Sequence, residues 1–446
     1  MNLNSRRYLV IILTLIFVII APTLILYGLG YKYDWAKKRL EKTGVFFIKS
    51  FPKGADIYLE GIKLKKKTPN QITRLLPKTY EVKIAQEGFR PWLKNLAIEP
   101  QITTFIEDVS LFYQQPEIKT LAKGSFTDFL TSQNLENIAL IEKGKDNKYI
   151  LWFYNPNNES FSKLYESTKN LQLLSWSDSG QKILLQENSD YLVVNKNQPD
   201  LVYNLNKIYK TTFDQLKWDA LNDNLLYGLK NQQLGLINLN QKNYTTITTD
   251  KIIDFLPYKN GVLCLNKTFE NLYLKIYLPN EERLIFTLPS GENYQFSNLD
   301  GQQIALNDQN QKQLYIINPN SSSQPISSIL KNASGFSWHD QALIYWDNSE
   351  LWAFYPVSNQ KILLERTVQK ISKAFWHPNI VYIYAVIGNK LKLYELDSRD
   401  QRNIYDILSV LPGEENFIAP NKKGDAFFAI TTIDNTPGFY KFILQP

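Results

Sequence analysis

Residues on which metal and acid–base chemistry most often depend are scarce in this 446-residue chain. It contains one cysteine, Cys264, and two histidines, His339 and His377. A single cysteine excludes a disulfide within the chain, and these three residues are too few for the common Cys/His zinc sites. No G-x-S-x-G elbow, P-loop or dinucleotide fingerprint occurs. The sequence therefore predicts no cofactor, metal site or catalytic residue, and leaves open whether the chain is an enzyme.

The local context of these three residues favours structural roles. Cys264 lies in the apolar run GVLCLN, which predicts a buried core thiol rather than a nucleophile. His339 in SWHD and His377 in FWHP each follow a tryptophan, so we expect both to form turns. A functional pair is the alternative, and it requires neighbouring repeats to bring the two rings close together.

The chain also lacks a basic surface on its larger part. Residues 31–112 contain 16 Lys/Arg against 9 Asp/Glu, whereas residues 113–446 contain 32 against 34. A nucleic-acid-binding protein would carry its basic face on the large domain, so no nucleic-acid partner is expected. The mean hydropathy of −0.30 excludes a polytopic membrane protein.

The densest basic cluster is KLKKK, which contains Lys63, Lys65, Lys66 and Lys67. These lysines are candidates for contact with anionic lipid headgroups or a cell-wall polymer. The alternative is a solvated hairpin that binds nothing.

One long apolar run is present near the N-terminus. Residues 8–29 contain no charge, which is long enough to cross a bilayer and too long for a cleaved signal peptide. We predict a tail over 1–7, a transmembrane signal anchor over 8–30 that contacts the lipid bilayer, and a charged juxtamembrane stalk over 31–43 that can be helical. The aromatic residues expected at the membrane interface are Tyr27, Tyr31, Tyr33 and Trp35.

Strand patterns begin directly after the stalk. In ADIYLEG, Ile57 and Leu59 alternate with polar neighbours, and in TYEVKIA the apolar residues Tyr80, Val82 and Ile84 do the same. Such period-two alternation, bounded by Gly and Pro, is typical of half-buried strands. Residues 44–112 are therefore predicted to form a small antiparallel β-sandwich.

This segment resembles the PEGA domain. The matching residues are Ser50-Phe-Pro-Lys-Gly-Ala55, Ile57-Tyr-Leu-Glu-Gly61, Thr68-Pro69, Leu76-Pro77, Tyr80, Val82 and Gly88-Phe89. Lys53 replaces the usual Glu of the name-giving tetrapeptide, and Lys66 and Lys78 stand where Gly is usual. The resemblance implies a small β-module of a cell-envelope protein, and it implies location more than activity.

The charges on either side of the membrane segment point to opposite orientations. Arg6 and Arg7 precede it, while five Lys/Arg follow it within 32–42. A bare count of positive charges would keep the C-terminal side in the cytoplasm. Because a short tail with two arginines usually stays inside, and because of the PEGA resemblance, we expect a cytoplasmic N-terminus and C-terminal domains outside.

Residues 113–446 repeat a unit of short strands with a period near 40 residues. An aromatic or apolar residue marks each unit, namely Phe129, Trp176, Trp218, Phe255, Phe296, Trp338, Trp376 and Ile418. This period predicts a β-propeller, with eight blades favoured over seven. We expect the tryptophans to pack between blades rather than to stack on sugars, and a strand over 116–122 to close the ring against the last unit.

The turns WSDSG and NLDG resemble those of TolB-type and WD40-like propellers, and Trp176–Gly180 comes closest to that pattern. The whole chain is thus predicted to be all-β with one transmembrane helix. We expect the protein to be a membrane-anchored, envelope-exposed binding or scaffold protein whose propeller contacts a protein or a cell-wall glycan. Two alternatives are an enzyme acting on envelope glycans in the propeller channel and a TolB-like envelope assembly factor.

Overall fold

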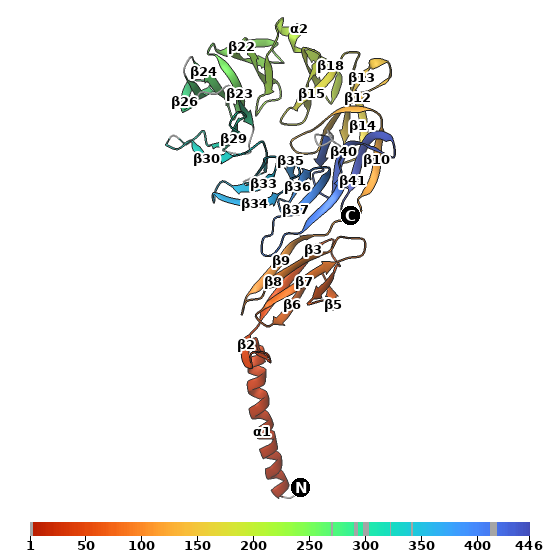
Figure 1. Cartoon of the computed structure of the whole chain (residues 1–446), viewed down its shortest axis with the longest axis vertical. Coiled ribbons are helices and arrows are strands. Elements are labelled where there is room, and N and C mark those ends of the chain that lie inside the picture. Colours follow the sequence, from red (N-terminus) through yellow and green to blue (C-terminus); the bar gives the residue numbers. More distant parts are fainter. Residues whose placement is uncertain are drawn as a thin grey trace. The chain divides into compact units, whose positions relative to one another are not determined.

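The computed structural model describes residues 3–268, 271–289, 293–297, 303–321, 323–339, 342–410 and 417–446. The chain divides into two compact units. Unit 1 contains Met1–Gln115, Glu395–Asn403 and Leu444–Pro446, and unit 2 contains Pro116–Tyr394 and Ile404–Ile443. The secondary structure of the described residues is mainly β-strand, apart from one long N-terminal helix (Figure 1).

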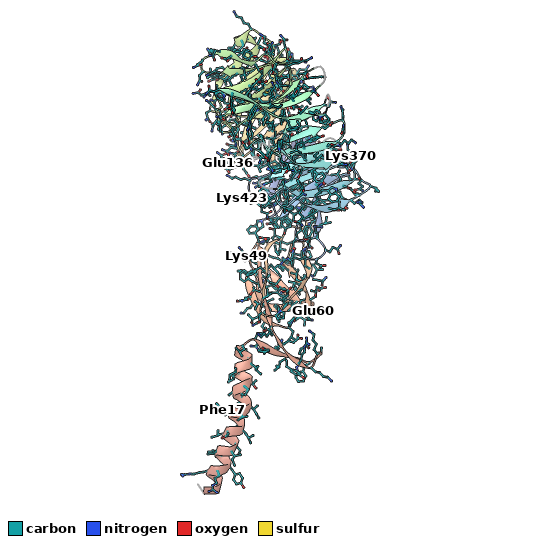
Figure 2. The ribbon with its side chains drawn as sticks, turned by 90° about the vertical axis from the view of Figure 1, so that its left-hand side faces the viewer. Phe17, Lys49, Glu60, Glu136, Lys370 and Lys423 are labelled. Carbon is teal, nitrogen blue, oxygen red and sulfur yellow. The ribbon has the colours of Figure 1, made fainter. Side chains whose placement is uncertain are left out.

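That helix, α1 (Leu3–Gly28), contains the apolar sequence predicted to cross a membrane. Residues Arg6–Gly28 have a hydropathy of 3.1, and none of this segment is buried. Apolar side chains such as Phe17 project from the helix into the surroundings (Figure 2). By length and composition α1 can serve as a single membrane anchor or as a signal sequence.

The segment after α1 is a β-hairpin, so the expectation that it can be helical is wrong. It consists of β1 (Tyr31–Asp34) and β2 (Arg39–Lys42), which pair antiparallel. The Asp34 carboxylate accepts the backbone N–H groups of Ala36 and Lys37 at 2.9 and 3.2 Å. A side chain that bonds its own turn in this way favours a turn over a helix.

Residues 44–110 form the predicted sandwich of two sheets. One sheet has the order β6-β3-β9 and the other β5-β4-β7-β8. The strands are β3 (Gly44–Phe51), β4 (Asp56–Leu59), β5 (Ile62–Lys67), β6 (Asn70–Leu75), β7 (Thr79–Ala85), β8 (Trp92–Ala97) and β9 (Thr103–Ser110). The prediction of purely antiparallel pairing is wrong at one place, because β3 and β9 are parallel.

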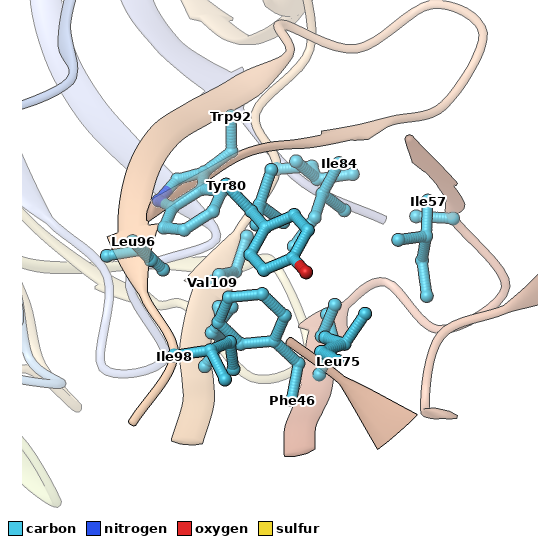
Figure 3. Packing of buried hydrophobic residues seen from close by; sticks show 14 of the residues in the cluster. Phe46, Ile57, Leu75, Tyr80, Ile84, Trp92, Leu96, Ile98 and Val109 are labelled. Carbon is cyan, nitrogen blue, oxygen red and sulfur yellow. The ribbon is translucent and has the colours of Figure 1, made fainter. Parts of the chain in front are cut away.

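The two sheets enclose one core (Figure 3). On β7 the predicted alternation is confirmed, since Tyr80, Val82 and Ile84 are buried and Thr79 and Glu81 are exposed. The facing sheet contributes Phe46 among others (Figure 3). At about 25 cal/mol per Å² of apolar area, such side chains each contribute roughly 1.5–3 kcal/mol.

Unit 2 is a β-propeller built from four-stranded antiparallel sheets. The described residues form eight such sheets. In each sheet the neighbouring strands follow one another in sequence, except that β10 from the start of unit 2 joins the last sheet. The first four are β11 (Phe126–Thr131), β12 (Ile138–Lys143), β13 (Tyr149–Asn155), β14 (Ser160–Ser167); β15 (Leu171–Trp176), β16 (Lys182–Glu187), β17 (Asp190–Asn195), β18 (Gln198–Asn204); β19 (Gln215–Trp218), β20 (Leu225–Lys230), β21 (Gln233–Asn238), β22 (Asn243–Thr248); and β23 (Ile252–Tyr258), β24 (Gly261–Lys267), β25 (Leu272–Leu278), β26 (Glu281–Leu288).

The remaining sheets are β27 (Tyr294–Ser297), β28 (Ile304–Asp308), β29 (Gln313–Ile317), β30 (Ile326–Lys331); β31 (Gly335–His339), β32 (Ala342–Trp346), β33 (Glu350–Tyr355), β34 (Gln360–Arg366); β35 (Ile371–Trp376), β36 (Tyr382–Ile387), β37 (Lys390–Glu395), β38 (Ile404–Ser409); and β39 (Ile418–Pro420), β40 (Ala426–Ile433), β41 (Thr436–Ile443) with β10 (Glu117–Lys123). Two short helical segments, η1 (Lys145–Asn147) and α2 (Leu205–Tyr209), lie between strands. The propeller fold is confirmed, and the blade number stays a prediction.

The ring closes as predicted. Strand β10, from the start of unit 2, pairs antiparallel with β41 from its end. The first and last sheets also share one hydrophobic cluster, in which Tyr154 contacts Phe428 and Phe439. The closing sheet is therefore completed by strands from both ends of unit 2, which joins the last repeat to the first.

Candidate functional site

The four lysines predicted to contact an anionic surface lie on or next to an edge of the sandwich. Lys63, Lys65, Lys66 and Lys67 are exposed on β5, the outer strand of its sheet. Asp56 pairs with Lys63 at 2.7 Å and with Lys67 at 3.4 Å. The hydrogen bond from Lys63 lowers the pKa of Asp56, outweighing its desolvation. Charge is thus partly neutralised at two of the four lysines.

Lysines on an edge strand also have a structural use. They hinder pairing of the exposed strand with another chain. Among the described residues Lys65 and Lys66 form no ion pair, so these two present the most available positive charge on β5. The four lysines thus lie together on one edge strand, which is compatible both with contact to an anionic partner and with protection of the edge against pairing.

His377 is a buried turn residue, as expected. Its Nε2 lies 3.0 Å from the carbonyl of Gly424, and the N–H of Asn379 donates to Nδ1 at 3.2 Å. Its own carbonyl accepts the N–H of Ile380, which closes the turn. Burial lowers the pKa of His377 to about 4, so the ring is neutral at pH 7.

Gly424 is required beside this ring. It has φ of +76°, and a Cβ at this position would lie 2.3 Å from Cε1 of His377. A side chain would therefore meet both backbone strain and a steric clash.

His339 has different surroundings from His377. It is half-buried at the end of β31, and its ring centroid lies 6.3 Å from that of Trp376. Its Nδ1 is buried without a hydrogen-bond partner in the described part of the chain. The turn after His339 and the NLDG turn lie outside the described residues. Cys264 is buried as predicted, and desolvation raises the pKa of its thiol.

The tryptophan anchors mostly join neighbouring sheets. Three indole N–H groups donate to a carbonyl in the first strand of the preceding sheet: Trp176 to Leu130 at 3.1 Å, Trp218 to Ser175 at 3.4 Å and Trp376 to Ser337 at 3.0 Å. All three side chains are buried, which confirms packing between sheets. Trp338 differs, because it is half-buried and its Nε1 has no partner among the described residues.

Trp338 and His339 line a cavity of about 760 Å³ within the propeller. Its lining comes from five sheets that follow one another around the closed ring. Most of the lining residues lie on the first strands β27, β31, β35 and β39 or in the turns beside them, as expected at the axis of the ring, and Asn307 and Trp346 lie on the second strands β28 and β32. The polar contributors include Gln133, Gln295, Asn307 and Gln309. The size lies within the usual range for small-molecule sites, about 300–1,000 Å³.

The cavity combines amide groups with aromatic rings. Gln309 Nε2 donates to Gln295 Oε1 at 2.7 Å, which holds two of the amides in place. Three buried polar atoms lack a partner among the described residues, namely Asn307 Oδ1, Trp338 Nε1 and His339 Nδ1. Leaving such an atom unpaired costs about 1–3 kcal/mol. One acceptor, one donor and one imidazole nitrogen are therefore available to a bound group.

A glycine helps to shape the cavity. A Cβ at Gly335 would lie 2.5 Å from the indole of Trp346. Glycine therefore lets this buried ring lie directly against the backbone of β31, and both residues line the cavity.

Unit 1 contains a buried polar cluster that was not predicted from the sequence. Lys94 pairs with Glu395 at 3.2 Å, and the two side chains are 0% and 3% exposed. Glu395 also accepts the indole N–H of Trp92 at 2.7 Å and the side-chain N–H of Asn403 at 2.8 Å. Trp92 and Glu395 are 303 residues apart in sequence, so no local pattern could have identified the cluster.

Unit 1 also holds the C-terminal end of α1 with an arginine. Arg74 donates to the carbonyls of Tyr27 and Tyr31 at 3.1 and 3.2 Å, and its guanidinium lies 3.3 Å from the centre of the Tyr27 ring. Cations near the last helical turn satisfy free carbonyls and the helix dipole. Two of the residues predicted for the membrane interface therefore contact the sandwich.

Residue types suited to metal binding do not converge in the described residues. No group of three or more His, Cys, Asp or Glu side chains there could hold a metal ion.

Comparison with known proteins identifies one domain by sequence. Residues 43–108 match the PEGA domain family, which confirms the resemblance inferred from the motifs. No curated protein matches the chain significantly.

Several solved structures are similar to the chain over about three quarters of its length. The C-terminal WD40 domain of Sif2 has a TM-score of 0.48 and 12% identity, and the match covers 74% of this chain and 99% of that one. Sqt1 of Saccharomyces cerevisiae has 0.46 and 12%, covering 74% and 98%. Oligogalacturonate lyase of Vibrio parahaemolyticus has 0.42 and 11%, covering 74% and 94%. The chain thus carries a PEGA domain, and its own sheets form a β-propeller.

Proposed function

We propose that this protein is a single-pass membrane-anchored binding or scaffold protein of the cell envelope. The helix α1 anchors it with the N-terminus in the cytoplasm, and the PEGA domain and the propeller lie outside. The PEGA domain spaces or docks the chain near the surface, and the propeller presents a rigid ring to a protein or glycan partner. The support is the combination of one apolar helix, one PEGA match and one closed propeller in a single chain.

One observation favours binding over catalysis. The polar side chains in the described lining of the axial cavity are amides, hydroxyls, an imidazole and indole N–H groups, and this lining contains no carboxylate. A glycosidase would instead place two carboxylates on either side of its substrate. Amides and aromatic rings hold and orient a ligand without supplying the acid and base of a hydrolytic reaction.

The lysines of β5 fit the same proposal. Lys63, Lys65, Lys66 and Lys67 would contact anionic lipid headgroups or an anionic wall polymer, at about 1 kcal/mol per charge near the surface. Lys65 and Lys66 should contribute most, because Asp56 pairs with the other two.

Protease treatment of intact cells tests the localisation. The protein carries a C-terminal tag, and the expected result is loss of the tag while a cytoplasmic marker stays intact. A matched variant, Arg6→Glu/Arg7→Glu, removes the positive charge before the helix and should increase the protected fraction. A fully protected tag on the unmodified chain would place the propeller in the cytoplasm and overturn the proposal.

A further inference from the structure

We infer that the axial cavity of the propeller binds an uncharged saccharide. This inference names the ligand class for the proposed binding function and rests on it. The cavity of about 760 Å³ offers side-chain amides, half-buried aromatic rings and three polar atoms that have no partner in the described part of the chain. A sugar ring presents hydroxyl groups around its rim and C–H groups on its faces, and these match the two kinds of lining.

The polar groups suit hydroxyls. A hydroxyl group both donates and accepts, so it can donate to Asn307 Oδ1 and accept from Trp338 Nε1. The nitrogen His339 Nδ1 can take either role, depending on its tautomer. Buried polar atoms are nearly always paired in folded proteins, either with protein groups or with ordered water. The hydroxyl groups of a sugar can take the place of water at these three atoms.

The aromatic groups suit the faces of sugar rings. Trp338 and Phe375 are half-buried and line the cavity, whereas the buried Trp176 and Trp218 are bonded to neighbouring sheets. Trp338 packs against the hydrophobic cluster between two neighbouring sheets, as expected for an anchor, and it also lines the cavity with its indole N–H unpaired among the described residues. It is thus the tryptophan anchor with the strongest case for contacting a ligand.

Charge distinguishes this cavity from the others in the propeller. A second cavity of about 400 Å³ shares Gln133 with it but is lined by Asp178, Lys217 and Asp219. The described lining of the 760 Å³ cavity contains no Asp, Glu, Lys or Arg. A neutral ligand therefore fits it better than an acidic saccharide, which would lack a cationic partner there.

Titration calorimetry of the full-length protein tests the inference, in a detergent without a sugar headgroup. The probes are chitotetraose and cellotetraose, with tetragalacturonate as the charged comparison. We expect a neutral tetrasaccharide to bind, and Asn307→Leu and Trp338→Phe each to weaken that binding by about tenfold or more. Trp218→Phe is the matched control, because Trp218 occupies the same position in another sheet and does not line the cavity. It should change the affinity less than twofold.

Three results would overturn the inference. They are no binding of either neutral probe, stronger binding of tetragalacturonate, or unchanged affinity in both cavity variants. Circular dichroism of each variant identifies a folding failure, and Asn307→Leu keeps the test decisive if Trp338→Phe does not fold. A protected tag in the protease experiment would remove the envelope location and leave saccharide binding intact, so the two failures are distinguishable.

Discussion

Replacing Glu395 by glutamine should destabilise unit 1 more than any other conservative exchange of an acid there. Glutamine keeps an acceptor for the N–H of Trp92, which lies 2.7 Å from Glu395 Oε1. It removes the charge that faces the ammonium of Lys94, which is 0% exposed. An ammonium group left buried without its partner typically costs about 3–5 kcal/mol. Because Asp397 Oδ2 remains 4.0 Å from Lys94 Nζ, we expect the lower end, about 3 kcal/mol.

The reverse exchange should cost less. In Lys94→Met the carboxylate of Glu395 still accepts N–H groups from Trp92 and Asn403. In the double variant Lys94→Met/Glu395→Gln no charge remains unpaired. We therefore expect the double variant to be more stable than Glu395→Gln alone, since a neutral replacement of a buried pair is often tolerated.

Hydrogen exchange of the full-length protein, read on peptides that cover β7 and β8, measures this effect. A loss of about 3 kcal/mol corresponds to roughly a hundredfold faster exchange through opening. Glu60→Gln is the matched control, because Glu60 pairs with Lys78 at 3.7 Å with both side chains about half exposed. An exposed pair should contribute at most about 1 kcal/mol. Equal exchange in the Glu395 and Glu60 variants would refute the reasoning.

Three further predictions concern single residues. Gly424→Ala should lower the melting temperature of the propeller, because the added Cβ would meet His377 in addition to positive-φ strain of about 1 kcal/mol. Gly54→Ala in the PEGA domain, with φ of +86° and no atom within 4 Å of its Cβ position, should destabilise that domain by the strain alone, and a loss of the same size in each variant's own domain would contradict the clash at Gly424. Arg74→Ala should speed proteolysis near Tyr27 by freeing the helix end, whereas an unchanged digestion rate would show that the contacts at 3.1 and 3.2 Å contribute nothing. Burial lowers the pKa of His377 from 6.5 to about 4. Between pH 4 and pH 6.5 the unfolded chain therefore binds more protons than the folded chain. The contribution of His377 to the free energy of unfolding should therefore be fully present above pH 6.5 and fall by about 3 kcal/mol towards pH 4. Melting curves of His377→Gln should lack this pH-dependent contribution. The same acid dependence in that variant would assign it to other groups.

Several features followed from sequence alone because they depend on local periodicity. An uncharged stretch of membrane length identified α1, and alternation with period two identified the inward side chains of β7. The spacing near 40 residues placed every anchor in the first strand of a sheet. The spacing did not predict the exact position of each anchor within its strand. Trp176 directly precedes Ser177, whose N–H bonds the carbonyl of Lys182, whereas Phe129 lies three residues before the equivalent Ser132.

The parts that only the tertiary structure decided depend on contacts between residues far apart in the chain. The parallel pairing of β3 with β9 and the Lys94–Glu395 pair have no signature in any short segment. The cavity also depends on distant parts of the chain, because Gln133 and His339 line it together only in the closed ring. Sequence periodicity states which face of a strand is buried, since that follows from backbone geometry. It does not state which strands meet or which polar atoms remain unpaired, because these depend on how the whole chain packs.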